Sequence, residues 1–244
     1  MNKVYQETIE VRSCHCDMGG TWRPGAILEA MQETAGVHSA IFGLSRSVMD
    51  GMGVAWVLAR TCVRMQRMPR SGEKITIETY PTANRHLFFP RSHVFYDASG
   101  AQVGSANSLW MLMDLSTRKL IRGEQVAAMI PDNRDKTPAA DMPATVHASE
   151  GEVLEHKLTA QYTDLDINQH VNNTKYLDWC CNALGTDVMR AYMLTSFDVN
   201  YDAEIRPDSE IDTKLWREGE RFVFCGYEGD KRHFGVSGTL TKRD

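Results

Sequence analysis

The feature that most constrains this chain of 244 residues is a repeated order of segments. Each half contains a short strand-like run, a polar loop, one segment with helical periodicity, and then strand-like runs to its end. Several runs are joined by short turns such as "DASG" (97–100) and "EGDK" (228–231), which predict hairpins and therefore an antiparallel sheet. The pattern predicts an α+β protein built by duplication.

One long helix is predicted in each half. The first begins with Pro24 in its first turn and ends at Gly43, and the second begins at about Asn172 and ends before Gly185. Each helix carries one stripe of residues at helical spacing, which we interpret as a core face. The stripes are Leu28, Met31, Ala35, His38 and Phe42 on the first helix, and Leu177, Cys180, Cys181 and Leu184 on the second.

Strands are predicted after each helix, at 54–65, 74–80, 93–97 and 102–114 in the first half, and at 196–201, 210–216, 221–227 and 234–240 in the second. Between the halves, three prolines lie among small and polar residues, which is typical of a connector. We therefore predict an N-terminal domain at 1–121, a connector at 122–151 and a C-terminal domain at 152–244.

The two halves can be aligned by placing "GAIL" (25–28) on "TKYL" (174–177) and Pro69 on Pro207. The alignment pairs Asp17 with Asp166, Gly19 with Asn168, Thr21 with His170 and Gln66 with Glu204. Only the second half keeps the full set of polar and charged side chains. If the repeat is real, one chain carries one site.

Composition excludes several classes of function. A net charge of −5 and a pI near 5.9 argue against a nucleic-acid partner. No run approaches the roughly 18 apolar residues of a membrane span, and the first residues lack the order of a signal peptide, so we expect a cytoplasmic protein without a membrane partner. The six cysteines are expected to be thiols, and "CHC" (14–16) lacks a second ligand pair, so we expect no metal and no cofactor.

The polar stretch before the second helix has three possible interpretations, of which the first is a calcium loop. Asp164, Asp166 and Asn168 occupy positions one, three and five of that pattern. Position six, however, is Gln169 where the loop needs glycine, and position twelve is Lys175 where it needs glutamate. The calcium interpretation therefore fails.

The second interpretation is a helix cap. Asn172 would accept hydrogen bonds from the first-turn N–H groups, while Val171 and Tyr176 would pack against each other across the cap. We expect this cap to be present. It leaves Asp166, Asn168 and His170 unexplained, although turns on the surface would account for them.

The third interpretation uses those three residues as a site at the helix N-terminus, where free N–H groups and a positive dipole end can polarise a carbonyl oxygen. Asn168 and His170 could add side-chain donors, which gives the oxyanion site that acyl-transfer chemistry requires. Thioesters suit such a site because a thiol with a pKa of about 8.5 can leave as thiolate.

The run "DLDINQHVNNTKYLDW" (164–179) closely resembles the signature of the acyl-ACP thioesterases, the plant plastid and bacterial enzymes that release fatty acids from acyl carrier protein. A second block, "VNYDAEIRPDSEI" (199–211), resembles the family's strand in which a tyrosine precedes the active-site glutamate by three residues, here Tyr201 and Glu204. The resemblance covers nearly the whole chain. Plant members commonly carry a cysteine after that glutamate, whereas this chain has Ile205, so a Cys/His mechanism at that position is excluded.

The resemblance implies a double hot-dog fold, in which two helices are each wrapped by a curved antiparallel β-sheet. It also implies a thioester hydrolase that acts on fatty acyl-ACP, releases the free fatty acid and terminates chain elongation. Its site would hold Asp166, Asn168, His170 and Glu204. In our hypothesis Glu204, with His170, activates water, Asn168 and the helix N-terminus bind the oxyanion, and Asp166 orients its neighbours; direct attack by Glu204 is the alternative.

Strand alternation argues against this role for Glu204. In a regular strand, Phe197, Val199 and Tyr201 share one face, which leaves Glu204 with Asp198 on the polar, solvated side. A catalytic role therefore requires a bulge, a strand end or a strong twist before Glu204.

The partner implied by the resemblance is an acyl carrier protein, which is acidic. Basic residues gather between 60 and 91 and could dock it; they are Arg60, Arg64, Arg67, Arg70, Lys74, Arg85 and Arg91. The acyl chain is expected in the first half, which has lost the polar set. Seven methionines could line its tunnel or be plain core: Met31, Met49, Met52, Met65, Met68, Met111 and Met113.

Two alternative functions remain open: an acyl-CoA thioesterase on the same fold, and a non-catalytic protein that binds acyl thioesters. A hydratase is less favoured, because the Asp/Asn/His run already has an explanation. Since the duplication supplies internally the pairing that single hot-dog proteins obtain by dimerising, we expect a monomer or a homodimer.

Overall fold

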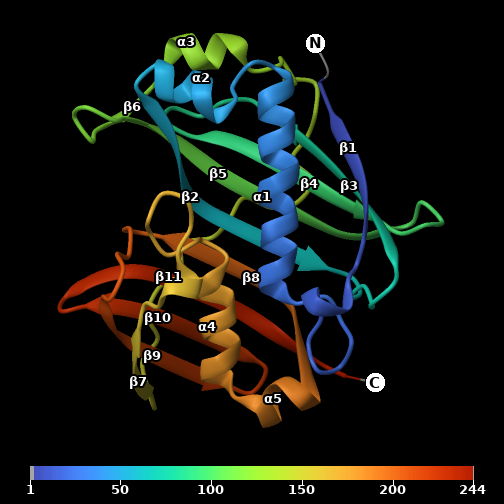
Figure 1. The fold of residues 1–244 in the computed structure, drawn as a ribbon. Coiled ribbons are helices and arrows are strands. Elements are labelled where there is room, and N and C mark those ends of the chain that lie inside the picture. Colours follow the sequence, from blue (N-terminus) through green and yellow to red (C-terminus); the bar gives the residue numbers. More distant parts are fainter. Residues whose placement is uncertain (1–2, 244) are drawn as a thin grey trace.

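The computed structural model describes residues 3–243, so Met1, Asn2 and Asp244 of the predicted domain ranges lie outside the described residues. Its strands form a single 11-stranded sheet in which every described pairing is antiparallel. Two long helices, α1 and α4, lie against the inner face of this curved sheet (Figure 1). The predicted α+β, double hot-dog architecture is confirmed.

The strands are β1 (Tyr5–Glu10), β2 (Val54–Met65), β3 (Lys74–Pro81), β4 (Phe89–Tyr96), β5 (Gln102–Asp114), β6 (Leu120–Ile121), β7 (Leu154–Thr159), β8 (Tyr192–Tyr201), β9 (Glu210–Glu218), β10 (Arg221–Glu228) and β11 (Lys231–Lys242). The α-helices are α1 (Pro24–Ile41), α2 (Arg46–Gly51), α3 (Glu124–Met129), α4 (Lys175–Leu184) and α5 (Thr186–Ala191). Single 3-10 turns lie at Ser13–His15 and Tyr162–Asp164.

The strand order shows the duplication directly. The sheet runs β1-β3-β4-β5-β2-β8-β11-β10-β9-β7, with β6 paired to β5, so the second half repeats the first in reverse about the β2–β8 junction. The alignment that pairs Gln66 with Glu204 also pairs Thr61 with Val199, and these two residues face each other across the junction. The junction therefore lies on a pseudo-twofold axis.

The central helix α1 begins and ends where the sequence indicates. Pro24 occupies its first turn, and Gly43 adopts a φ of 90° just beyond its end, a left-handed conformation that stops the helix. The apolar face of α1, including Ile27 and Leu28, joins the corresponding face of α4 in one hydrophobic core that extends through both halves. A smaller core under α2 and α3 closes the far end of the first half.

The connector crosses the outer face of the sheet and covers polar side chains of the central strands. Backbone N–H groups of Ala144 and Val146 each donate, at 2.8 Å, to Oδ1 of Asp198 and to Oδ1 of Asn200 respectively. Asp198 and Asn200 are buried as a result. The expectation of a solvated polar face on β8 is therefore wrong, because alternation predicts which side chains share a face but not what covers that face.

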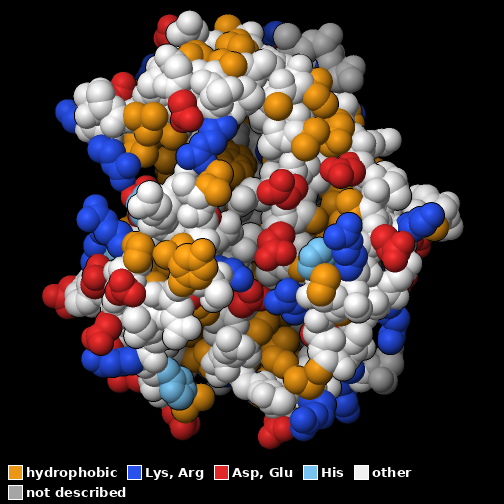
Figure 2. Space-filling view, in the orientation of Figure 1, with side chains coloured by type: hydrophobic (Ala, Val, Ile, Leu, Met, Phe, Trp, Pro, Cys, Tyr) orange, Lys and Arg blue, Asp and Glu red, His pale blue; other side chains and the backbone are white. Residues whose placement is uncertain are grey.

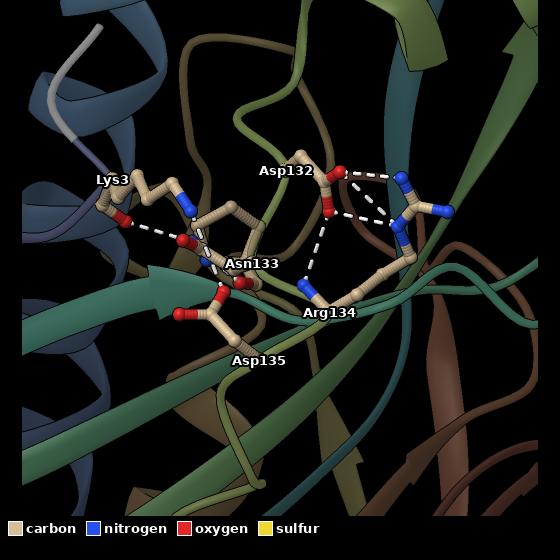
Figure 3. Close-up of polar contacts among 6 residues, drawn as sticks. Lys3, Asp132, Asn133, Arg134 and Asp135 are labelled. Carbon is tan, nitrogen blue, oxygen red and sulfur yellow. Dashed lines mark hydrogen bonds and ion pairs between the residues drawn. The ribbon is translucent and has the colours of Figure 1, made fainter.

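The beginning of the connector is held at the N-terminal edge of the sheet. The Nδ2 group of buried Asn133 donates to the carbonyl oxygens of Lys3 and Pro81, at 2.8 and 2.9 Å, and Lys3 also pairs with Asp135 (Figure 3). Arg134 and Asp132 form a separate local ion pair. The side-chain amide of Asn133 thus joins three segments that lie far apart in the sequence.

The loop before α1 repeats the loop before α4. Asp17 N donates to Thr21 O and Asp166 N donates to His170 O, both at 2.8 Å, and the residues before Thr21 and His170 both have a positive φ. In the first half, however, the carboxylate is occupied: Arg243, from the end of the chain, donates to Asp17 and to Thr21. Burial acts to raise the pKa of Asp17, but the hydrogen bonds from Arg243 and Thr21 outweigh it and lower the pKa.

This contact generates a prediction about stability. Asp17→Asn removes the charge that Arg243 meets, and we expect the free energy of unfolding to fall by about 1–2 kcal/mol at pH 7. Because the pKa of Asp17 is lowered in the folded state, its contribution is present above the unfolded pKa of 3.8 and is lost as the pH falls through the lower folded value. Urea unfolding at several pH values measures both effects.

The difference between the wild-type protein and Asp17→Asn should therefore shrink below about pH 4. Asp187→Asn is the control, because that side chain is 96% exposed. A difference that stays constant from pH 7 to pH 3 would show that the Asp17 charge does not stabilise the fold.

Candidate functional site

The loop before α4 is a tight turn whose centre is fixed by Asp166. Oδ1 of Asp166 accepts from the backbone N–H of Asn168 at 2.7 Å, and Oδ2 accepts from Nδ2 of Asn168 at 3.2 Å. Gln169 follows in a left-handed conformation with a φ of 62°, which is uncommon for a residue other than glycine. The turn orients the side-chain amide of Asn168 and leaves one of its two N–H bonds for another acceptor.

Strand β8 ends at Tyr201, three residues before Glu204. The N–H groups of Asp202 and Ala203 both donate to the carbonyl oxygen of His233, at 2.9 and 3.1 Å, so the side-chain alternation of β8 is broken after Tyr201. Val171 N then donates to Ile205 O at 2.9 Å, which joins this segment to the loop before α4. The strand end that a catalytic role for Glu204 requires is present.

Three of the four predicted site residues come from one loop, and this geometry brings the fourth to them. Nε2 of His170 lies 3.5 Å from Oε2 of Glu204. The two side chains are 27% and 40% exposed, so both are accessible to water and to a ligand. Asp166 and Asn168 are held together in the same turn.

Arg118, which is not among the predicted site residues, also contacts Glu204. Arg118 lies between β5 and β6 of the first half, and its Nη2 donates to Oε2 of Glu204 at 2.7 Å. No local pattern indicates this contact, because the two residues are 86 positions apart and meet only when the halves pair. The prediction placed all site residues in the second half, so it does not include Arg118, which comes from the first half.

The start of α4 differs from the prediction. The helix begins at Lys175 and not at Asn172, and its N-cap residue, Thr174, makes no side-chain capping bond. Asn172 does accept from Thr174, through Oδ1, from the backbone N–H at 3.0 Å and the hydroxyl at 2.9 Å. Asn172 therefore forms a side-chain turn one step before the helix, and Val171 and Tyr176 are both buried in the main core.

A cavity of about 1450 Å³ extends from this loop into the first half. One end is lined by polar residues that include Asp166, Asn168 and Asn173, and the other by hydrophobic residues of α1, α2, β2, β4 and β5. The hydrophobic lining includes Phe42, Leu44, Val54, Trp56, Phe89 and Trp110. Figure 2 shows a hollow on this face beside α1, with hydrophobic side chains gathered around it.

Aromatic and aliphatic side chains dominate this lining in place of the predicted methionines. Of the seven methionines proposed for the tunnel, Met49 alone lines the cavity, whereas Met31, Met65 and Met68 belong to the main core. His170 and Glu204 are not among the lining residues; they lie beside the polar end, next to Asp166 and Asn168. The cavity therefore opens toward the candidate site without enclosing it.

Three of the seven basic residues between 60 and 91 are engaged within the protein. Arg64 pairs with Asp198 at 2.5 Å, and Arg67 pairs with Glu73 and Asp97. Arg91 is buried in the cavity wall, where it donates to Thr79 and His38, and burial lowers its pKa to about 10. These three arginines are poor candidates for docking a partner.

The two cysteines of α4 have thiols whose pKa is raised. Burial, followed by the nearby charge of Asp178, raises the pKa of Cys181 to about 12, and burial raises that of Cys180 as well. Ile205, at the position of the plant cysteine, is fully buried in the core. Burial therefore disfavours a thiolate nucleophile at Cys180 and Cys181, and Ile205 has no thiol.

Within residues 3–243, no cluster of three or more His, Cys, Asp or Glu side chains is arranged to hold a metal ion. In the same range, none of the helices combines the length and the hydrophobicity needed to cross a bilayer.

Family models place this chain in a known class of proteins. The model of the acyl-ACP thioesterase N-terminal domain matches residues 2–128, and that of the acyl-ACP thioesterase C-terminal domain matches residues 147–236. The chain therefore belongs to the acyl-ACP thioesterase family.

Two plant proteins illustrate the similarity in sequence. Dodecanoyl-[acyl-carrier-protein] hydrolase of Cinnamomum camphora, a chloroplastic protein, is 28% identical over 228 residues, which cover 85% of this chain and 58% of the relative. Oleoyl-acyl carrier protein thioesterase of Coriandrum sativum, also chloroplastic, is 26% identical over 229 residues, with 86% and 61% covered. The chain thus spans less than two thirds of the length of these relatives.

Solved structures share the fold over nearly their whole length. An acyl-ACP thioesterase from Bacteroides thetaiotaomicron superposes with a TM-score of 0.88 at 23% identity, covering 98% of both chains. The 12:0-ACP thioesterase from Umbellularia californica gives a TM-score of 0.82 at 22% identity, covering 100% of this chain and 99% of the other. Both comparisons support the double hot-dog assignment.

The cavity generates a prediction about ligand binding. Gly36 lies in α1, lines the cavity, and has open space where a Cβ would lie. We expect Gly36→Leu to fold at least as stably as the wild type, because glycine in a helix interior costs roughly 0.5–1 kcal/mol relative to alanine. It should weaken binding of a fluorescent long-chain fatty acid by roughly tenfold, or about 1.4 kcal/mol.

The matched control is Gly51→Leu, since Gly51 also lies in a helix with open space around it but does not line the cavity. Equal affinities of both variants and the wild type would show that the fatty acid binds elsewhere.

Proposed function

We propose that this chain hydrolyses the thioester of fatty acyl-ACP, releasing the free fatty acid and terminating chain elongation. The observation that carries the proposal is a pair of contacts around one loop: Asp166 with Asn168, which line the polar end of a large, mostly apolar cavity, and His170 with Glu204. Family membership and the names of the plant relatives support an acyl-ACP substrate over acyl-CoA or a purely binding role.

The chemistry begins with a water molecule held by Glu204 and His170. Both contacts to the Glu204 carboxylate, from Arg118 and from His170, use Oε2, so Oε1 is placed to accept a proton from water. The water oxygen then bonds to the carbonyl carbon as its proton passes to Glu204. His170, whose Nε2 lies 3.5 Å from Oε2 of Glu204, holds the water beside that carboxylate while the proton moves to Glu204. Catalytic hydrogen bonds are often long before substrate binds, so this distance is consistent with the role.

The tetrahedral intermediate carries a negative oxygen that needs donors. The N–H bond of Asn168 that Asp166 does not use can donate to it. At the start of α4 the backbone N–H groups of Thr174 and Lys175 already donate to Asn172, so the helix N-terminus acts through its dipole. When the C–S bond breaks, the electron pair leaves with the sulfur of the phosphopantetheine arm, which takes up the proton held by Glu204. The products are a fatty acid and the free thiol of the carrier.

The two halves divide the work in this proposal. The first half, residues 1–121, holds the acyl chain, the connector at 122–151 covers the outer face, and the second half, residues 152–244, supplies the four site residues. Acyl carrier protein is the partner that delivers the chain. A cytoplasmic location and a monomeric or homodimeric state remain predictions from the sequence.

The first test is a series of acyl-ACP substrates of varied chain length, with free fatty acid as the readout. His170→Ala and Glu204→Gln should each lower kcat by at least about 100-fold, because each removes a group that moves or holds a proton. His156→Ala and Glu220→Gln are matched controls, since both side chains are exposed and lie outside the site. Undiminished activity in both site variants would overturn the assignment.

Two further arms separate the alternatives. Acyl-CoA with the same chain should be hydrolysed more slowly than acyl-ACP; faster turnover of acyl-CoA would indicate the acyl-CoA thioesterase. A single turnover in H₂¹⁸O should leave Glu204 unlabelled if water attacks directly, whereas ¹⁸O in its carboxylate would indicate a covalent anhydride.

A further inference from the structure

The carboxylate of Glu204 is held by a side chain from the opposite half of the molecule. Nη2 of Arg118 lies 2.7 Å from Oε2 of Glu204, a shorter contact than the 3.5 Å between His170 and the same oxygen. Arg118 is 56% exposed and Glu204 is 40% exposed. An ion pair this exposed contributes little to stability, so stability alone does not explain why the contact exists.

The turn that presents Arg118 is tightly built. Oδ1 of Asp114 accepts from the Ser116 hydroxyl at 2.7 Å and from the backbone and hydroxyl of Thr117 at 2.7 and 2.9 Å. The same bonds, led by that of Ser116, lower the pKa of Asp114 to about 2. Backbone bonds from Arg118 N to Asp114 O and from Asp114 N to Lys119 O, both at 2.9 Å, close the turn.

Arg118 itself adopts a left-handed conformation, with a φ of 56°. Residues with a side chain avoid this region, and such conformations concentrate at functional sites where the surrounding structure holds them. The backbone of Arg118 is therefore held in place before any ligand binds, which fixes the position of its Cα and the direction in which its side chain leaves the turn.

The other half of the molecule contains a corresponding contact. Arg243 follows β11, the counterpart of β5 in the strand order, and donates to Asp17 and Thr21 in the loop of the first half. Each of the two equivalent loop regions thus receives an arginine from beyond the last long strand of the opposite half. In the first half the arginine is bound by the loop carboxylate itself, whereas in the second half it is bound by Glu204.

We propose that Arg118 is a positioning residue that holds Oε2 of Glu204 so that Oε1 faces the attacking water. The inference rests on the proposed function. Without Arg118, the contact that the described residues leave to the Glu204 carboxylate is the longer one of 3.5 Å to His170. The backbone around Glu204 stays held by the Val171–Ile205 hydrogen bond and by the contact of His233 Nδ1 with Glu204 O at 3.0 Å. The carboxylate could then rotate away from the water, which lowers the rate without weakening substrate binding.

A different role is possible for an exposed arginine near a cavity mouth, namely docking of the acidic carrier protein. Leu115, three residues earlier in the same turn, lines the cavity, so the turn lies beside the path of the substrate. The two roles differ in what they predict for a substrate without a carrier: positioning affects the chemical step for every thioester, whereas docking affects binding of acyl-ACP alone.

The test compares Arg118→Ala, Arg118→Lys and the neighbouring control Lys119→Ala on two substrates, an acyl-ACP and the same acyl group on N-acetylcysteamine. Arg118→Ala should lower kcat by about 10- to 100-fold on both substrates with little change in KM. Arg118→Lys or added guanidinium at low millimolar concentration should restore part of the rate, and Lys119→Ala should match the wild type. Melting temperatures of all variants should stay close to the wild-type value.

Glu204→Gln and the double variant Arg118→Ala/Glu204→Gln complete the series. If Arg118 acts through Glu204, the double variant should be no slower than Glu204→Gln alone. A wild-type kcat in Arg118→Ala, beside an inactive Glu204→Gln, overturns the positioning role and leaves the proposed function intact. A raised KM for acyl-ACP alone assigns Arg118 to docking instead, and full activity in Glu204→Gln overturns both proposals.

Discussion

The pairing of β2 with β8 is the contact on which the rest of the structure depends. It joins two similar halves edge to edge about a pseudo-twofold axis, with Thr61 opposite Val199, and it connects strands β1–β6 and strands β7–β11 into one 11-stranded sheet. Because the halves pair in this way, α1 and α4 share one core and the loop of each half lies within reach of the other. If the pairing of β2 with β8 were broken, the sheet would no longer be continuous, and the shared core and the site would be lost with it.

Duplication followed by divergence explains why the two equivalent loops differ. Both keep the same backbone turn. The backbone N–H groups of Asp17 and Asp166 make equivalent hydrogen bonds, and the residue with a positive φ lies three positions after each of them. In the first half the Asp17 carboxylate accepts hydrogen bonds from Arg243 and Thr21, so it stabilises the fold. In the second half Asp166 binds Asn168 and leaves His170 to meet Glu204, so the same turn presents groups that a ligand can use.

The sequence was sufficient to predict much of this arrangement, because the relevant signals are local. Hydrophobic periodicity gave α1 and strands such as β2 and β5, and the polar loop gave three of the four site residues. The start of α4 was placed too early because Asn172 makes a side-chain turn that resembles a cap in sequence. The covered face of β8 and the contact of Arg118 with Glu204 could not be predicted, since both depend on segments distant in sequence.

The central claim is that the acyl chain lies in the first half while its thioester meets the loop of the second half. A crystal structure with a hydrolysis-resistant amide analogue of dodecanoyl-pantetheine tests this most directly. The claim predicts the amide oxygen within hydrogen-bonding distance of Asn168 Nδ2, the carbonyl carbon beside Glu204, and the alkyl chain along Trp56 and Phe89. An alkyl chain that lies in the second half, or a carbonyl remote from Asn168 and Glu204, would contradict it.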